Sequence, residues 1–243
     1  MAASAATLAS GAAIPQKDDS NMTPNQGTSP NQGVAVKQQL LKGQGTKYGD
    51  GCQEENCWQS GACAFKGYTL PAGIDGSTCV SDAIWQSSGN CGGCIAVTYK
   101  GKKLTIMVTN RTGGGANHLD MPPATWSKLT GDCCGGGVPE IEWEWIKCPI
   151  TAPLKLQMHG GSSQYWFAAT VLDATYRTAK MEVNDGGSWS PMVRKEQGFY
   201  VHNGALKSQA PTVRVTSITG SQVLIKNVNP KPGKPIAGEG NYQ

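Results

Sequence analysis

The sequence predicts an all-β protein of two domains, and three observations lead to this prediction. First, the chain has 32 glycines and 14 prolines among 243 residues, which is typical of short strands joined by many turns. Second, short apolar or alternating runs recur between turn residues, whereas helical spacing is rare. Third, all nine cysteines lie between Cys52 and Cys148. The change in composition after Cys148 predicts a domain boundary near Pro149.

The first 42 residues are predicted to form a disordered leader. The opening "MAASAATLASGAAIP" has small-residue stretches like the end of a signal peptide but lacks a basic start and a strong apolar core, so we interpret it as a signal remnant. Residues 15–42 are rich in Gln, Asn and Pro and contain "TPNQG" followed by "SPNQG", which leaves almost nothing to bury. Asn21 opens a glycosylation sequon that the directly following Pro24 disfavours.

Residues 43–149 are expected to form the first domain. Its strand candidates are "IAVTY", "LTIMVT" and "IEWEWI". In the last of these, the alternation places Ile141, Trp143 and Trp145 on one face, where they are most simply core residues. The segment "PPATWSKL" has proline where a helix begins and apolar residues at roughly helical spacing. One short helix is therefore expected between the strands of this domain.

The cysteines of this region indicate a secreted protein rather than a metal site. Nine cysteines in so short a stretch are typical of domains that fold in an oxidising compartment. Eight of them can form four bridges and one thiol is left over, but the pairing stays open. Cys91 and Cys94 form a lone C-x-x-C, and the three histidines supply no H-x3-5-H pair. We therefore expect no metal.

Residues 150–229 are expected to form a second domain, a β-sandwich. Strand candidates such as "FAATVL", "TVRVTSI" and "QVLIKNV" are separated by turns such as "NDGG" at intervals typical of that fold. Lys and Arg outnumber Asp and Glu by eight to four here, against eight to ten in residues 43–149. A basic domain favours acidic polymers as partners. Residues 230–243 are expected to be a flexible tail.

A glycine-rich loop, "TNRTGGGANHLDMPP", ends by presenting the carboxylate of Asp120. Hydrolysis of a sugar bond normally takes two carboxylates, so the partner of Asp120 is the first question that this loop raises. His118 lies two residues before Asp120 and is open to two interpretations: it orients the carboxylate or binds sugar, or its backbone simply fits the turn.

Several motifs, taken in order, resemble a known family. These are "GTKYGDG", "NCGGC", "VTNRTGGGANHLDMPPATWSKL" and "CPI" followed by "GGSSQYWFAATV". In order and spacing they resemble the two-domain expansins, most closely the fungal expansin-like proteins, over residues 43–229. The resemblance implies a six-stranded double-psi β-barrel followed by an immunoglobulin-like β-sandwich, similar to the family-63 carbohydrate-binding modules.

The resemblance also implies a function and a location. Expansins loosen plant cell walls without detectable hydrolysis, so we expect a secreted, extracellular, monomeric protein that is not an enzyme and needs no cofactor. Its expected partner is plant cell wall polysaccharide, which means cellulose and also xyloglucan, xylan or pectin. We expect no nucleic acid partner. A membrane partner is not expected either, because no segment approaches the roughly 18 apolar residues that span a bilayer.

On the same likeness, Asp120 matches the aspartate required for wall loosening. Thr46 and Tyr48 match the threonine and the aromatic residue of the groove's entry motif. Two positions depart from the pattern, because many expansins have an aspartate where this chain has Asn110 and an aromatic residue where it has Thr112. Asn110 can hydrogen-bond sugar hydroxyls but cannot act as a base. The predicted groove residues are Thr46, Tyr48, Asn110, Thr112, His118 and Asp120.

Asn110 also opens an "NRT" sequon, where a glycan would crowd the groove; an unoccupied sequon is the interpretation we favour. The barrel resembles the family-45 glycoside hydrolases as well, which gives the first alternative: an inverting endo-β-1,4-glucanase with Asp120 as acid and Asp50 as base. Such a pair must stand roughly 6.5–9.5 Å apart. The second alternative is a polysaccharide-binding protein whose barrel is inert.

The expansin sandwich binds cellulose through three exposed aromatic residues, and Tyr165 and Trp166 match the first two. Neighbours on a regular strand point to opposite faces, so both rings face solvent only if Tyr165 belongs to the turn or a bulge intervenes. The third position falls on Gln197. We therefore expect either a shorter platform or a substitute from Phe199 or Tyr200.

Overall fold

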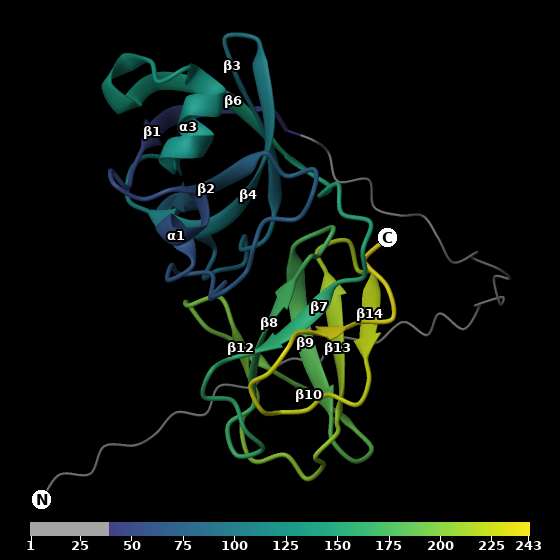
Figure 1. Ribbon diagram of the computed structural model, residues 1–243. Helices are drawn as coiled ribbons and strands as arrows, with labels where there is room; N and C mark the ends of the chain where they lie inside the picture. Colours follow the sequence, from purple (N-terminus) through teal and green to yellow (C-terminus); the bar gives the residue numbers. More distant parts are fainter. Residues whose placement is uncertain (1–38) are drawn as a thin grey trace, which may run out of the picture. The chain divides into compact units, whose positions relative to one another are not determined.

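The computed structural model describes residues 39–243 (Figure 1). Most of the expected leader, including the signal remnant and the Asn21 sequon, lies outside the described residues. The first strand begins at Leu41, so the last two residues of the expected leader already belong to a sheet. Within residues 39–243, no helix combines the length and the apolar content that crossing a bilayer requires.

Six strands close into a barrel in the order β1-β5-β2-β4-β3-β6. β1 runs parallel to β5, and β2 runs parallel to β4, while the other neighbouring pairs are antiparallel. The closed barrel and the all-β class confirm the prediction. The strands are β1 (Leu41–Lys47), β2 (Gly76–Ser81), β3 (Cys94–Tyr99), β4 (Lys102–Thr112), β5 (Leu119–Met121) and β6 (Gly137–Ile146).

The barrel interior is apolar and its helices are short. Ile141 and Trp143 of β6 are buried, as the alternation predicts, whereas Trp145 is only half-buried. The expected helix is α3, which begins at Pro123 and is labelled in Figure 1. Its Trp126 and Leu129 are buried and belong to the barrel core. The helices are α1 (Glu54–Trp58), α2 (Asp82–Trp85), α3 (Pro123–Thr130) and the 3-10 turn η1 (Cys134–Gly136).

Four disulfides and one free thiol account for the nine cysteines, as predicted. The free thiol is Cys79, which is buried in β2. Cys91 and Cys94 belong to different bridges. Within the described part of the chain, no three His, Cys, Asp or Glu side chains are grouped so that they could hold a metal ion. The bridges are Cys52–Cys57, Cys63–Cys91, Cys94–Cys148 and Cys133–Cys134.

The second half of the chain forms two sheets, in the orders β10-β9-β13-β14 and β11-β12-β8-β7-β15. Alternate residues of the strands, such as Val213 and Val215 of β13, are buried, as a half-exposed sheet requires. The strands are β7 (Lys155–Met158), β8 (Ala168–Leu172), β9 (Thr178–Asn184), β10 (Trp189–Pro191), β11 (Val193–Arg194), β12 (Tyr200–Val201), β13 (Thr212–Ser217), β14 (Gln222–Ile225) and β15 (Ile236–Ala237).

The expectation of a flexible tail over residues 230–243 is wrong. This segment contains β15, which pairs with β7 through Ile236 and Leu156. Tyr242 is only 1% exposed and fills the core of the second half, with its hydroxyl 2.9 Å from the Thr178 hydroxyl. The sequence of the segment is poor in apolar residues, but its two large ones, Ile236 and Tyr242, pack against the sheets.

Polar contacts join the barrel to the second half of the chain. The Tyr68 hydroxyl donates a hydrogen bond of 2.9 Å to Asp173. The Arg177 guanidinium lies 4.1 Å from the centre of the Trp145 ring and hydrogen-bonds Asn90. Burial lowers the pKa of Arg177 to about 10. Trp145 is therefore an interface residue, which explains why it is not fully inside the barrel.

Glu182 of β9 carries a prediction about acid stability. The side chain is 5% exposed and accepts bonds of 2.8 Å from Arg214 and Lys180, and the bond from Arg214 is the main cause that lowers its pKa. Because the folded pKa is lowered, the contribution is present above the ordinary value of about 4.3 and is lost as the pH falls through the lower folded value. We expect Glu182→Gln to reduce the free energy of unfolding at pH 7 by about 2 kcal/mol.

Urea unfolding at a series of pH values measures this effect, which should shrink as the solution becomes acidic. Glu239→Gln is the matched control, because Glu239 pairs with Lys226 at 2.6 Å but is half exposed. Exposed pairs contribute about 0–1 kcal/mol. An equal loss in both variants, or a Glu182→Gln loss that persists at low pH, would contradict the prediction.

Candidate functional site

Asp120 lies in the barrel wall, on the three-residue strand β5. Parallel pairing with β1 places it opposite Thr46, and antiparallel pairing with β2 places it opposite Cys79. The Thr46 hydroxyl lies 2.5 Å from one carboxylate oxygen of Asp120, and the Thr112 hydroxyl lies 3.3 Å from the other. The carboxylate is half-buried. Three of the predicted groove residues therefore meet in one hydrogen-bonded cluster.

His118 is a buried member of this cluster and contacts Thr46. It is 7% exposed, and its Nε2 lies 2.8 Å from the Thr46 hydroxyl while its Nδ1 lies 3.0 Å from the Gly113 carbonyl oxygen. Gly114 has φ +109°, and a Cβ there would lie 2.3 Å from the imidazole, so only glycine fits beside the ring. The glycine-rich loop thus gives the histidine its place next to Thr46.

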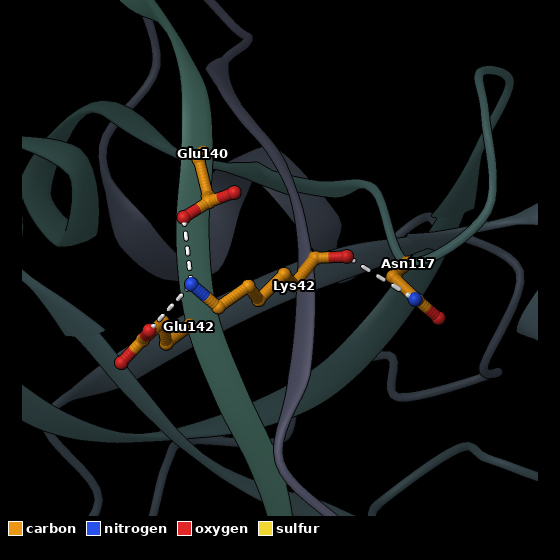
Figure 2. Close-up of polar contacts among 4 residues, drawn as sticks. All are labelled: Lys42, Asn117, Glu140 and Glu142. Atoms are coloured by element: carbon orange, nitrogen blue, oxygen red, sulfur yellow. Dashed lines mark hydrogen bonds and ion pairs between the residues drawn. The ribbon is translucent and has the colours of Figure 1, made fainter.

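The loop that precedes β5 is tied to β1 (Figure 2). The Asn117 side-chain amide donates a bond of 3.2 Å to the Lys42 carbonyl, and the Lys42 ammonium pairs with Glu140 at 2.9 Å and Glu142 at 3.0 Å on β6. Asn117 itself has φ +60°, a conformation that asparagine tolerates better than most residues. A Cβ at Gly43 would lie 2.1 Å from the Asn117 carbonyl oxygen, so glycine permits this close approach.

Tyr48 and Cys79 lie next to Asp120. Burial is the main cause that raises the pKa of the Cys79 thiol to about 12, and it also raises the pKa of Tyr48 well above its ordinary value. Both groups are therefore neutral in ordinary buffers. The buried Tyr48 hydroxyl has no hydrogen-bond partner among the described residues. Sequence reasoning placed Tyr48 here but missed Cys79, for which the only signal was the odd cysteine.

Asp50 lies on an exposed turn. Its side chain is 89% exposed and pairs with the Lys47 ammonium at 3.0 Å. In the described structure no hydrogen bond connects Asp50 to the cluster around Asp120. Its described contact is this one exposed pair, whereas a general base has to be held within hydrogen-bond reach of the water that it activates.

Asn110 of β4 holds a neighbouring loop in place. Its side-chain oxygen accepts a bond of 2.8 Å from the Ala62 backbone N–H. A Cβ at Gly61 would lie 2.6 Å from the Asn110 side-chain carbon and 2.7 Å from its amide nitrogen. The side chain is therefore packed against this loop, and the contact disfavours a glycan at the "NRT" sequon.

Tyr165 and Trp166 are both exposed, by 75% and 37%. This follows from the turn in which they lie: the Ser163 hydroxyl accepts the backbone N–H groups of both residues, at 3.2 and 3.3 Å. Tyr165 belongs to the turn, and Trp166 forms an isolated bridge with Ser163. The condition under which two neighbouring rings can both face solvent is thus met.

Tyr200 is not part of an exposed platform, so this prediction is wrong. It is 5% exposed, lies in the core, and donates its hydroxyl to the Thr178 carbonyl at 3.0 Å. Phe199 is half-buried and lies 6.0 Å from the Trp166 ring. His159, which sequence reasoning missed, lies 5.1 Å from Trp166 and 4.8 Å from Phe199.

A cavity of about 510 Å³ lies beside this aromatic group. Residues of the barrel and residues of the second half of the chain both line it, and many of them carry amides or hydroxyls suited to sugar hydroxyls. Gln197, the position expected for the third aromatic residue, is among them. The lining includes Gln59, Ser60, Gly61, Lys66, Gln157, His159, Gln197 and Phe199.

Comparisons with known proteins show which proteins this chain is similar to. No family model matches the chain. Expansin-like protein 5 of Dictyostelium discoideum is 21% identical over 174 residues, which cover 68% of this chain and 73% of that protein. Expansin-B1 of Zea mays is 24% identical over 197 residues, which cover 73% of each chain.

Solved structures of expansins are also similar to this chain. The apo expansin of Clavibacter michiganensis is 24% identical with a TM-score of 0.73, covering 84% of this chain and 98% of that chain. A mutant of that expansin in complex with cellohexaose has a TM-score of 0.72 at 22% identity and the same coverage. At these identities the structures show the fold. Together with the curated relatives, they confirm the resemblance to the expansins.

Proposed function

We propose that this expansin-like chain is a secreted protein that binds cellulose and related wall polysaccharides and loosens plant cell wall material without hydrolysis. The observation that carries the proposal is the exposed pair Tyr165 and Trp166, which a series of contacts and one shared cavity link to the Asp120 cluster. A similar expansin has been solved with cellohexaose, a cellulose fragment, which supports the choice of ligand.

The series of contacts begins at the barrel. Cys79 pairs in register with both Asp120 and Asn110, and Asn110 packs against Gly61. Gly61 lines the same cavity as His159, whose ring meets Trp166. Cys79 is buried and links Asp120 to Asn110 beneath the surface, so a glucan chain would lie above it, with the carboxylate at one end and the exposed aromatic rings at the other.

Each part of the path has a chemical role in this proposal. The flat faces of Tyr165 and Trp166 match the apolar faces of pyranose rings, and their burial provides most of the affinity. Thr46, Thr112 and Asp120 offer hydrogen bonds to sugar hydroxyls, which compete with the bonds between neighbouring glucan chains. Asn110 acts mainly by holding the loop beside the path.

The proposal is tested by wall-extension and sugar-release assays on one preparation. We expect Asp120→Asn to lower the rate of wall extension at least tenfold and Asp50→Asn to leave it unchanged, with no sustained release of reducing sugar from amorphous cellulose in any protein. Asp50→Asn is the matched control, because it removes the same group from an exposed turn of the same domain.

Two other outcomes would overturn the proposal. Sustained sugar release that disappears in both variants would identify an inverting endoglucanase that uses Asp50 and Asp120. Cellulose binding without wall extension, unchanged by Asp120→Asn, would identify a binding protein with an inert barrel.

A further inference from the structure

The hydrogen bonds around Thr46 require one hydrogen more than neutral His118 and ionised Asp120 supply. The Gly113 carbonyl oxygen can only accept, so His118 Nδ1, 3.0 Å away, carries a hydrogen and donates it. The Thr46 hydroxyl has a single hydrogen of its own. It faces Nε2 of His118 at 2.8 Å and the oxygen of Asp120 at 2.5 Å.

If Nε2 were bare and Asp120 were ionised, two acceptors would compete for that one hydrogen. One of the two short contacts would then bring lone pairs together without a hydrogen between them. A second hydrogen removes the conflict, and it can occupy either of two positions. In the first form, Nε2 of His118 carries it and donates to the Thr46 oxygen, while the Thr46 hydroxyl donates to the carboxylate. In the second form, the Asp120 carboxyl carries it and donates to the Thr46 oxygen, while the Thr46 hydroxyl donates to Nε2. Shifting each of the two hydrogens by one place interconverts the two forms.

We infer that His118 is a positioning residue for Asp120 and that His118, Thr46 and Asp120 share one titratable hydrogen. While the hydrogen is present, Thr46 holds both partners. When it is lost at higher pH, Thr46 can bond only one of them, and the carboxylate gains freedom. One consequence of the inference rests on the proposed function. If Asp120 contacts polysaccharide, the ability of its carboxylate to form hydrogen bonds with the polymer depends on pH.

The other titratable groups around the cluster do not supply the hydrogen. Cys79 on β2 and Tyr48 after β1 have pKa values raised by burial and stay neutral. Glu54 on α1, which faces Tyr48, accepts hydrogen bonds from Ser77 and from Thr125 at 2.7 Å. Lys47, the neighbour of Thr46, pairs with Asp50. Within residues 39–243, the side-chain bonds of Thr46 run to His118 and Asp120 alone.

Nuclear magnetic resonance of the imidazoles tests this inference on the full chain without polysaccharide. The chain has three histidines, and His159 and His202, both in the second half, serve as references in the same spectra. We expect neutral His118 to carry its hydrogen on Nδ1. We also expect Asp120→Asn to lower its titration midpoint by about 1 pH unit or more, because the carboxylate that favours the charged form is gone.

Thr46→Val and Thr46→Ser form the matched pair. Valine has the shape of threonine without the hydroxyl and should move the His118 midpoint in the same direction as Asp120→Asn, whereas serine keeps the hydroxyl and should leave it in place. His159 and His202 should not move in any variant. The inference is overturned if neutral wild-type His118 carries its hydrogen on Nε2, a result that needs no variant to fold. It is also overturned if the His118 midpoint is the same in all folded variants.

The experiments distinguish a failure of this inference from a failure of the proposed function. Absence of cellulose binding or wall extension would leave these titrations unchanged, because they are measured on the free protein.

Discussion

Replacing both Tyr165 and Trp166 with alanine is expected to weaken cellulose binding about 100-fold, which corresponds to about 3 kcal/mol. The two rings are exposed by 75% and 37%, so a sugar ring that stacks on them removes apolar surface from water on both sides. The measurement is a binding isotherm on microcrystalline cellulose. Each single variant should lose part of the affinity, and Tyr165→Ala should leave the fold untouched because its ring contacts solvent.

The control for this prediction is Trp189→Ala. Trp189 belongs to β10 of the four-stranded sheet, is half-buried, and has the Arg214 guanidinium 4.2 Å from its ring centre. Its removal should leave cellulose binding unchanged. Because Trp166 contacts His159 and Phe199, the thermal midpoint of every variant must also be compared. Equal loss of binding in Trp189→Ala would mean that the exposed turn is not the cellulose platform.

Removing the Cys94–Cys148 bridge is expected to have the largest effect on stability. The bridge closes a loop of 54 residues, from the start of β3 to the segment that follows β6. Loop-closure entropy predicts a loss of about 4 kcal/mol for a loop of this length. Both cysteines are buried, so the serines that replace them would also bury two hydroxyls. Chemical unfolding of the Cys94→Ser, Cys148→Ser double variant measures this loss.

The Cys52–Cys57 bridge provides the comparison, because its sequence separation is only 5. The same argument predicts a loss of about 2 kcal/mol for its double serine variant. A smaller loss for the long loop than for the short one would show that the bridges do not act mainly through the unfolded chain.

Much of the fold could be predicted from alternation and motif order, and the limits of the prediction have physical causes. In the run "IEWEWI" apolar and acidic residues alternate, so Ile141 and Trp143 were correctly expected inside the barrel. Trp145 follows the same pattern but ends beneath Arg177, a residue from the other half of the chain. Which surface a distant segment covers is a tertiary property that local spacing does not encode.

In the candidate site, too, motifs predicted which residues take part, whereas their contacts depend on the tertiary structure. The motif "GTKYGDG" predicted Thr46 and the loop around Asp120 predicted His118, but the bonds between these residues depend on the pairing of β1 with β5. Tyr200 was misplaced because β12 has only two residues and both are buried, so no local pattern indicates which side chains of this segment face solvent. No sequence pattern pointed to His159, because its contact with the Trp166 ring arises only when the chain folds.

The C-terminal segment has a consequence for self-association. β15 is the edge of the five-stranded sheet and has only two residues, Ile236 and Ala237, preceded by Lys234 and Pro235. A short edge strand flanked by lysine and proline offers little for another chain to pair with. A chain ending before Ile236 would leave the backbone of β7 open over Leu156, and we expect such a truncated protein to aggregate by strand pairing. β15 therefore covers a strand edge that would otherwise be open to pairing with other copies of the chain.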